Sequence, residues 1–294
     1  MKALIMDTKH FTNRLLQYGL LSLFVLLLTG CSQQDQPQTE QQALDGQQLT
    51  IGLIPEQDIF TQKKRYEPLF TYLSQELGLT INIKTLSRYG NILTNFSDLD
   101  LDGAFFGSFT GALAVRRLKV EPLVRPQHLS GASTYYGMVF VKRGSNIRTA
   151  DDMRHKRMVF VDKATTAGYL LPLSYFKSLG IDNYQEWFSE YYFSGTHEDA
   201  IKDVLNGQAD IGAAKNTIFY QMASLDERVL KDLEILTTSP HVPANGLAVR
   251  STLSEDLKQR LKHKLLNLHM TSDGRQILNA LNFEKFIETT IDDY

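Results

Sequence analysis

The stretch MVFVDKATTAGYLLPLS, residues 158–174, predicts a strand followed by a turn and a helix. Its first four residues are apolar, as in a buried strand, and the apolar residues after Gly168 are spaced as in a helix that ends at Gly180. Thr165 and Thr166 stand where this helix begins. A helix start has unpaired amides and partial positive charge, so it suits an anion. An ordinary threonine cap on a surface helix fits the same residues equally well.

The N-terminal segment predicts export and lipid attachment. A basic start is followed by an apolar run, residues 20–28, which is too short for a comfortable membrane span. The run ends in Leu28-Thr29-Gly30-Cys31, which resembles a bacterial lipobox, and Cys31 is the single cysteine of the chain. We expect residues 1–30 to be a lipoprotein signal peptide, with Cys31 lipidated and the protein anchored to a membrane in the periplasm. A plain signal peptide or a signal anchor is the alternative. Residues 31–48, rich in Gln, Asp and Pro, predict a flexible tether.

The composition indicates a folded protein that does not bind nucleic acid. Of the 294 residues, 43% are hydrophobic and 22% are charged, which allows a sizeable core. The formal net charge is −2, and it becomes −4 once residues 1–30 are removed. Nucleic-acid binding would need a basic stripe, which the sequence lacks. Any anion site must therefore be local.

Strand and helix patterns alternate along the rest of the chain. Residues 49–55 and 79–86 read as strands, and residues 65–77 between them have the apolar spacing of a helix. Such alternation predicts an α/β fold with a largely parallel sheet. Residues 102–108 and 210–216 share one form, in which an acidic residue and a short apolar strand lead to a polar residue at a helix start. This repeat predicts two similar lobes, with a ligand bound beyond the carboxyl ends of their strands.

These features resemble the phosphate-, phosphite- and phosphonate-binding proteins of ABC transporters, which have the type II periplasmic binding protein fold. The resemblance covers about residues 49–281. It is carried by Ile51-Gly52-Leu53-Ile54-Pro55, Tyr66-Glu67-Pro68-Leu69 with Tyr72-Leu73, Phe106-Gly107-Ser108-Phe109, Val161-Asp162, Thr165-Thr166-Ala167-Gly168-Tyr169 with Pro172, Gly195-Thr196-His197-Glu198 and Gly207-Gln208-Ala209-Asp210. It implies two α/β lobes around a ligand cleft, with residues 49–137 plus 238–294 in lobe 1 and residues 138–237 in lobe 2. Strands near Tyr136 and Leu236 would join the lobes.

The resemblance also implies which residues hold an oxyanion. The hydroxyls and amides of the family's site correspond to Thr165, Thr166 and Ala167, where a Ser-Thr-Ser run is common, and the family's histidine corresponds to His197. Phe109 stands in a turn that commonly carries a tyrosine, and Asn216 replaces an acidic residue. If His197 contacts the anion, its pKa should rise, because an opposite charge favours the imidazolium.

Three further residues at strand ends are candidates for the ligand site. Tyr89 and Tyr136 could donate phenolic hydrogen bonds, and Ser108 occupies the place in the repeat that Asn216 occupies in the second copy. Each has a structural alternative, since the tyrosines fit as core aromatics and Ser108 fits as a helix cap. A structural or solvated histidine is likewise the alternative for His197.

The sequence gives little support to catalysis. The seven histidines show no metal-ligand spacing, and no free cysteine remains as a nucleophile once Cys31 is lipidated. We expect no enzymatic activity, no metal and no cofactor.

The sequence therefore predicts an extracytoplasmic solute-binding lipoprotein. Its lobes would close by a hinge motion on a small phosphorus oxyanion (phosphonate, phosphite or phosphate-like), and the closed form would dock on an ABC transporter permease. The alternative is a sensor with the same lobes that signals to a membrane receptor or kinase.

Overall fold

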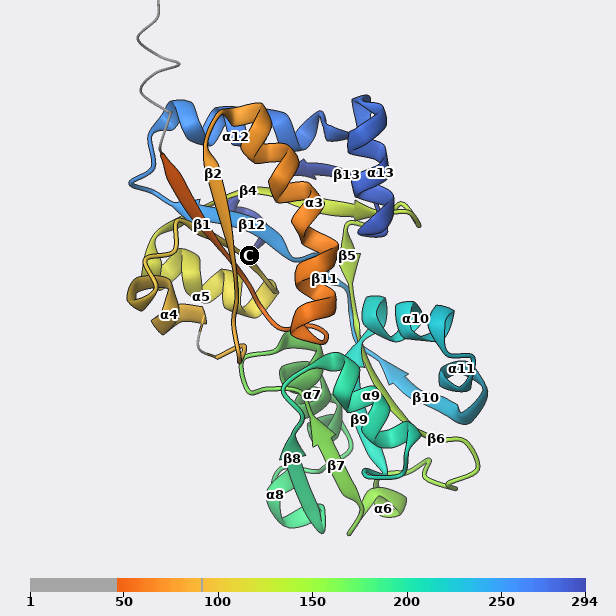
Figure 1. Cartoon of the computed structure of the whole chain (residues 1–294). Coiled ribbons are helices and arrows are strands. Elements are labelled where there is room, and N and C mark those ends of the chain that lie inside the picture. Colours follow the sequence, from red (N-terminus) through yellow and green to blue (C-terminus); the bar gives the residue numbers. More distant parts are fainter. Residues whose placement is uncertain (1–46, 91) are drawn as a thin grey trace, which may run out of the picture. The chain divides into compact units, whose positions relative to one another are not determined.

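The computed structural model describes residues 47–90 and 92–294 (Figure 1). The chain from residue 45 to the C-terminus forms one compact unit. The predicted signal peptide, Cys31 and all but the last two residues of the predicted tether lie outside the described residues. Among the residues described, no helix has the length and apolar character needed to cross a membrane.

The first lobe is built on a six-stranded sheet with the order β13-β4-β12-β3-β1-β2. Its strands are β1 (Gln48–Leu53), β2 (Thr80–Thr85), β3 (Gly103–Phe106), β4 (Val120–His128), β12 (Gly246–Arg250) and β13 (Phe283–Glu288). β1 pairs in parallel with β2 and β3, whereas β12 is antiparallel to both β3 and β4.

The second lobe is built on a five-stranded sheet with the order β10-β6-β9-β7-β8. Its strands are β6 (Gly137–Lys142), β7 (Arg157–Phe160), β8 (Glu190–Phe193), β9 (Ile211–Lys215) and β10 (Leu233–Thr238). β7 is parallel to β8 and β9, and β6 is antiparallel to β9 and β10.

The prediction of a largely parallel sheet is wrong, because both sheets are mixed. Parallel neighbours require a crossover connection, usually a helix. β6 and β12 each enter their sheet directly from the other lobe, without a helix before them, and run antiparallel to their neighbours.

Two crossing segments join the lobes. β5 (Thr134–Tyr135) lies between β4 and β6 in the chain, β11 (Val242–Pro243) lies between β10 and β12, and the two pair antiparallel. The first lies beside Tyr136, where the sequence predicted a crossing. The second follows Leu236 by six residues, because β10 continues to Thr238.

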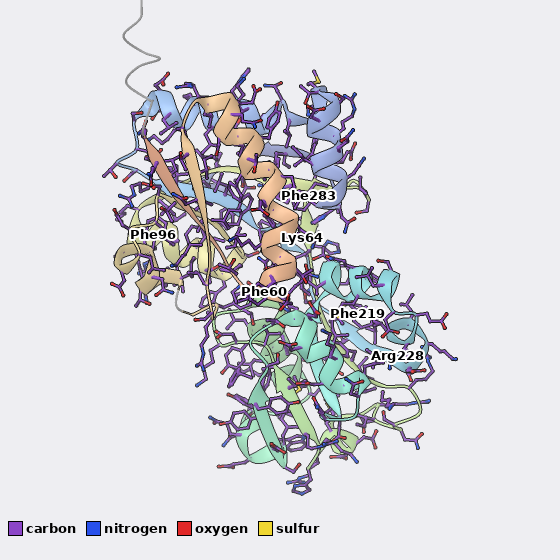
Figure 2. All side chains as sticks on the ribbon, viewed as in Figure 1. Phe60, Lys64, Phe96, Phe219, Arg228 and Phe283 are labelled. Carbon is purple, nitrogen blue, oxygen red and sulfur yellow. The ribbon has the colours of Figure 1, made fainter. Side chains whose placement is uncertain are left out.

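Helices cover both faces of each sheet. The helices of the first lobe are α3 (Ile59–Leu77), α4 (Ile92–Asp98), α5 (Ser108–Leu118), α12 (Glu255–Leu266) and α13 (Ser272–Ala280), with the short turns η2 (Leu268–Met270) and η3 (Ile291–Asp293). Those of the second lobe are α6 (Ala150–Met153), η1 (Thr166–Leu170), α7 (Leu171–Ser178), α8 (Tyr184–Trp187), α9 (His197–Leu205), α10 (Asn216–Leu225) and α11 (Arg228–Asp232). Phe96 of α4 and Phe219 of α10 belong to one buried apolar cluster that continues from the first lobe into the second (Figure 2).

The first helix of the first lobe is longer than its apolar pattern predicts. α3 begins at Ile59, six residues before the predicted start, because the Asp58 carboxylate accepts the Thr61 N–H at 2.9 Å and caps the helix. The added turn buries Gln62, a polar residue that apolar periodicity cannot detect. The predicted stop at Gly78 is confirmed, and that residue has the left-handed conformation typical of a glycine helix end.

Candidate functional site

A small cavity lies where residues of the two lobes meet, and we call it the interlobe cavity. Its volume is about 10 Å³. Five of the predicted site residues line it: Tyr89, Thr165, Thr166, Ala167 and His197. The other residues that line it are Ile54, Glu56, Gly107, Thr110, Tyr135, Ala164, Lys215 and Asn245.

One wall of the interlobe cavity begins with η1, a π-helical turn that continues into α7. The sequence predicted one uniform helix here. π-helical turns are rare and recur at functional sites. Gly168 packs directly on the residue after β7, since a Cβ at this position would lie 2.4 Å from the Cβ of Val161. The Gly168 carbonyl also accepts the Val161 N–H at 3.1 Å. Gly168 therefore holds the start of the helix against the sheet.

The two threonine hydroxyls at this helix start have different partners. The Thr165 hydroxyl is buried and donates to the Asp162 carbonyl at 2.6 Å. Thr166 Oγ1 accepts the N–H of Phe109, a first-lobe residue, at 3.0 Å. Thr166 therefore bridges the lobes. Ala167 is 1% exposed and can offer a ligand only its backbone amide.

Lys215 is the one Lys or Arg side chain among the described residues that line the interlobe cavity. It was not among the site residues predicted from the sequence. Its ammonium lies 2.7 Å from Glu56 Oε1, 3.1 Å from Asn245 Oδ1 and 4.4 Å from the centre of the Tyr135 ring. Burial is the largest single effect and acts to raise the pKa of Glu56, but the charge of the adjacent ammonium and the hydrogen bonds from Lys215 and Asn245 together lower it below its ordinary value, so Glu56 is a carboxylate. Because Lys215 ends β9 and Glu56 follows β1, this buried ion pair joins the lobes.

The backbone of Glu56 joins the lobes a second time. Its carbonyl accepts the N–H groups of His197 at 3.1 Å and Glu198 at 3.4 Å, which are the first two amides of α9. These amides have no acceptor within their own helix. One lobe thus caps a helix of the other.

His197 is a buried neutral histidine. It is 3% exposed, and its Nδ1 accepts the backbone N–H of Lys215 at 3.2 Å. That bond places the ring proton on Nε2, which makes Nε2 a donor. Burial lowers the pKa of His197 to about 3, a fall that Glu56 opposes and Lys215 reinforces. The predicted rise in the pKa of His197 depends on contact with a bound anion and stays a prediction.

Among the described residues, Tyr89 contributes the one fully buried side-chain polar atom of the cavity wall that lacks a hydrogen-bond partner. The side chain is 3% exposed, and its hydroxyl is buried without a hydrogen-bond partner. Its ring packs edge-on against His197, with 5.8 Å between the ring centres. A buried hydroxyl without a partner is costly, so a ligand acceptor would stabilise it.

Four predicted residues lie outside the interlobe cavity: Ser108, Phe109, Tyr136 and Asn216. The Ser108 hydroxyl donates to the Pro243 carbonyl at 2.7 Å and lies 3.1 Å from the Tyr135 hydroxyl, so it fastens α5 to the crossing segments. Tyr136 and Asn216 line a larger neighbouring cavity, where the Tyr136 N–H donates to Asn216 Oδ1 at 3.0 Å. A ligand role for these four residues stays a prediction.

A sequence signal for Lys215 does exist. Every residue of β9 is buried, and a lysine within a buried strand is rare unless it is paired. The repeat of residues 102–108 in residues 210–216 ends one residue later, so it indicates Asn216 instead of Lys215. Glu56 and Asn245 lie in connections beside strand ends, and no local pattern distinguishes them from other polar loop residues.

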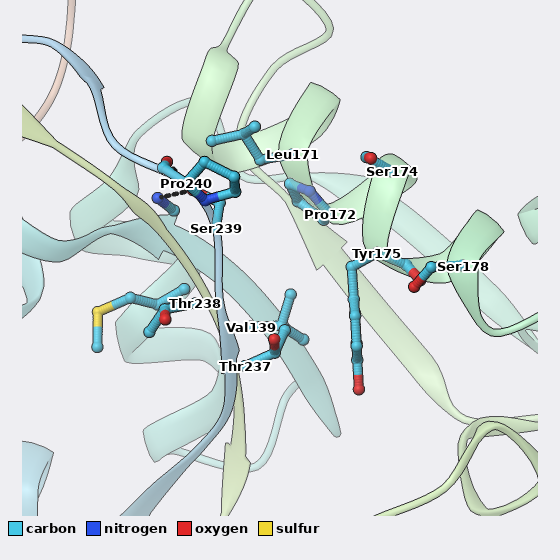
Figure 3. A pocket seen from close by; sticks show the side chains of 12 residues that line it. Val139, Leu171, Pro172, Ser174, Tyr175, Ser178, Thr237, Thr238, Ser239 and Pro240 are labelled. Atoms are coloured by element: carbon cyan, nitrogen blue, oxygen red, sulfur yellow. Dashed lines mark hydrogen bonds between the residues drawn. The ribbon is translucent and has the colours of Figure 1, made fainter.

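A second pocket, of about 190 Å³, lies beside the junction of β6 and β10 (Figure 3). Thr237, Thr238, Ser239 and Pro240 face Leu171, Pro172 and Tyr175 across it. None of the described residues that line it is charged, so these side chains do not suit an anion. Within the described residues, no group of His, Cys, Asp or Glu side chains could hold a metal ion.

Comparison with known proteins gives a family match over most of the chain. The family described as "ABC transporter, phosphonate, periplasmic substrate-binding protein" matches residues 51–294. The phosphonates-binding periplasmic protein of Escherichia coli (strain K12) is 22% identical, over 81% of this chain and 71% of the relative. The probable ABC transporter phosphite binding protein PhnD1 of Prochlorococcus marinus is 24% identical, over 84% and 86%. The phosphate-import protein PhnD of Mycolicibacterium smegmatis is 26% identical, over 81% and 77%.

Solved structures show the same fold. A binding protein component of an ABC phosphonate transporter from Pseudomonas aeruginosa is similar with a TM-score of 0.78, at 22% identity, over 84% of this chain and 82% of that one. PhnD1 from Prochlorococcus marinus, solved in complex with methylphosphonate, is similar with a TM-score of 0.76, at 21% identity, over 84% and 94%. The predicted two-lobed α/β fold of type II periplasmic binding proteins is confirmed.

Proposed function

Because the chain belongs to the family of periplasmic substrate-binding proteins of phosphonate ABC transporters, we propose that it captures a small phosphorus oxyanion between its lobes and presents it to a transporter permease. The ligand is a phosphonate, phosphite or phosphate-like anion, the classes for which its relatives are named. Members of this family are substrate-binding components rather than enzymes, as the sequence predicted.

The observation that carries this proposal is the convergence of donors on the interlobe cavity. The Tyr89 hydroxyl is buried there without a partner, and the Lys215 ammonium and the helix start at Thr166 line the same cavity. Together they supply a neutral hydroxyl, a full positive charge and amides at the positive end of a helix, which suit an oxyanion.

Binding on these groups requires the lobes to separate first. The interlobe cavity has room for about one water molecule, which is less than any phosphorus oxyanion needs. The anion competes with the Glu56 carboxylate for Lys215 and with the Phe109 amide for Thr166. Contacts between the lobes are thus exchanged for contacts with the ligand as the lobes close again.

A thermal-shift series with methylphosphonate, phosphite, phosphate and sulfate tests this function. A ligand that binds only the folded protein raises its melting temperature. We expect at least one phosphorus oxyanion to raise it and sulfate to have little effect. A protein that responds to none of the phosphorus anions would not have the proposed function.

The first variant to measure is Thr166→Ala. We expect it to weaken the affinity for the best phosphorus oxyanion about tenfold or more, the size of one hydrogen bond to a charged group. Isothermal titration calorimetry gives the affinity, and Thr252→Ala, an exposed position, is the matched control. Equal affinities for Thr166→Ala and the control would remove this helix start from the site.

We also propose that a lipid on Cys31 holds the protein at a membrane in the periplasm. The support is the lipobox-like run 28–31 after a basic and apolar start. Cys31→Ser should move the protein from the membrane fraction to the soluble fraction when cells are fractionated. Variant protein that stays with the membrane would point to a signal anchor instead.

A further inference from the structure

A second, much larger cavity borders the interlobe cavity, and we call it the substituent cavity. Its volume is about 650 Å³, within the range of small-molecule sites. The two cavities share three lining residues, Glu56, Lys215 and Asn245, so they meet at the buried ion pair. The pocket beside β6 and β10 shares no described residue with the interlobe cavity. A group attached to a bound oxyanion would therefore extend into the substituent cavity.

One wall of the substituent cavity is aromatic. Tyr136, Tyr220 and His241 all line it. The rings of Tyr136 and His241 lie 5.0 Å apart, and His241 Nδ1 is fixed by Thr134 Oγ1 at 3.0 Å. Tyr220, on α10, is 45% exposed, so much of its ring is free to contact a ligand. Flat rings of this kind favour an aromatic or apolar partner.

The charged groups around the substituent cavity are already engaged. Glu56, Arg65 and Lys215 are the Asp, Glu, Lys and Arg residues among its described lining. Glu56 and Lys215 pair with each other, and Arg65 donates to Gln57 Oε1 at 2.6 Å and Gln221 Oε1 at 3.0 Å. A cationic substituent would find no free carboxylate on these side chains, because Glu56 is already paired with Lys215, whereas Arg65 is bonded only to neutral oxygens.

On these grounds, and resting on the proposed function, we propose that the ligand is a phosphonate or phosphate monoester whose substituent is about the size of an aromatic ring and carries no positive charge. The oxyanion lies with Tyr89, Lys215 and the start of η1, and the substituent lies against Tyr136, Tyr220 and His241. The protein thus selects larger organic phosphorus compounds over phosphite, phosphate and methylphosphonate.

Isothermal titration calorimetry with methylphosphonate and phenylphosphonate tests this specificity, because the two ligands share a head group and differ in the ring. We expect the wild-type protein to bind phenylphosphonate at least fivefold more tightly. Tyr220→Ala should reduce this preference at least fivefold, since it removes one aromatic face. Leu225→Ala, on the same helix and 82% exposed, should keep the wild-type preference.

The possible outcomes distinguish failure of this inference from failure of the proposed function. Equal or tighter binding of methylphosphonate by the wild-type protein would overturn the inference and leave oxyanion binding intact. A preference for phenylphosphonate that survives both Tyr220→Ala and His241→Ala would overturn the placement of the ring. If neither phosphonate bound, the proposed function would be overturned and this inference with it.

Discussion

Single buried side chains determine the electrostatics of the site. Lys215 is 4% exposed and Glu56 lies beside it, so the full charges on the cavity cancel in the closed protein. His197 adds no charge, because burial lowers its pKa to about 3. An incoming anion can therefore pair with the Lys215 ammonium once Glu56 has moved away from it.

The pKa of His197 predicts how stability depends on pH. Its pKa is about 3 in the folded protein and 6.5 for an unperturbed histidine, so folding favours the neutral ring. The stabilisation is complete above pH 6.5 and is lost as the pH falls towards 3. Between pH 7 and pH 5, His197 should account for a loss of about 2 kcal/mol in the free energy of unfolding.

Urea denaturation at pH 7 and pH 5 measures this loss. The variant His197→Asn should lose about 2 kcal/mol less than the wild-type protein between the two pH values. The exposed His155 provides the control, and His155→Asn should behave like the wild-type protein. A wild-type pH dependence in His197→Asn would contradict the buried neutral histidine.

Among the elements, η1 decides where the helix amides lie. Gly168 allows the turn to approach Val161, which places Thr166 and Ala167 on the cavity. Gly168→Ala should destabilise the protein by about 1–3 kcal/mol, the usual cost of overpacking a core. It should also weaken oxyanion binding, because the turn must move away from the sheet.

Chemical denaturation and calorimetry together check this prediction. Gly90→Ala is the matched control, because a Cβ at Gly90 has no neighbour closer than 3.6 Å, and it should retain the stability of the wild-type protein. Wild-type stability in Gly168→Ala would show that the turn can adjust without cost.

The elements could be predicted from the sequence where their signals are local. Apolar spacing predicted the helix that ends at Gly78, and the polar run at Thr165 and Thr166 marked the start of the η1 segment. The antiparallel direction of β12 could not be predicted, because it depends on a strand that returns from the other lobe. The pair of Glu56 and Lys215 joins positions 159 residues apart, and no spacing rule reaches that far.

At the scale of the whole molecule, contacts between the lobes compete with the ligand. Glu56→Gln leaves Lys215 buried without a countercharge, so the free energy of unfolding should fall by about 3 kcal/mol. The phosphonate restores the missing negative charge. Its addition should therefore raise the melting temperature of Glu56→Gln by more than that of the wild-type protein.

A scanning calorimeter measures both effects. Asp226→Asn breaks an exposed ion pair with Arg228 and should leave the melting temperature and the response to ligand unchanged. A phosphonate shift in Glu56→Gln no larger than that of the wild-type protein would mean that the ligand and Glu56 do not share Lys215.

The cap that Glu56 places on α9 makes opening of the protein observable at a single atom. The His197 N–H is bonded to a carbonyl of the other lobe, so it can exchange with solvent deuterium only when the lobes part or the helix end frays. The Ala200 N–H of the same helix is bonded to Thr196 and reports fraying without opening. The ratio of the two exchange rates thus measures how often the lobes of the ligand-free protein part.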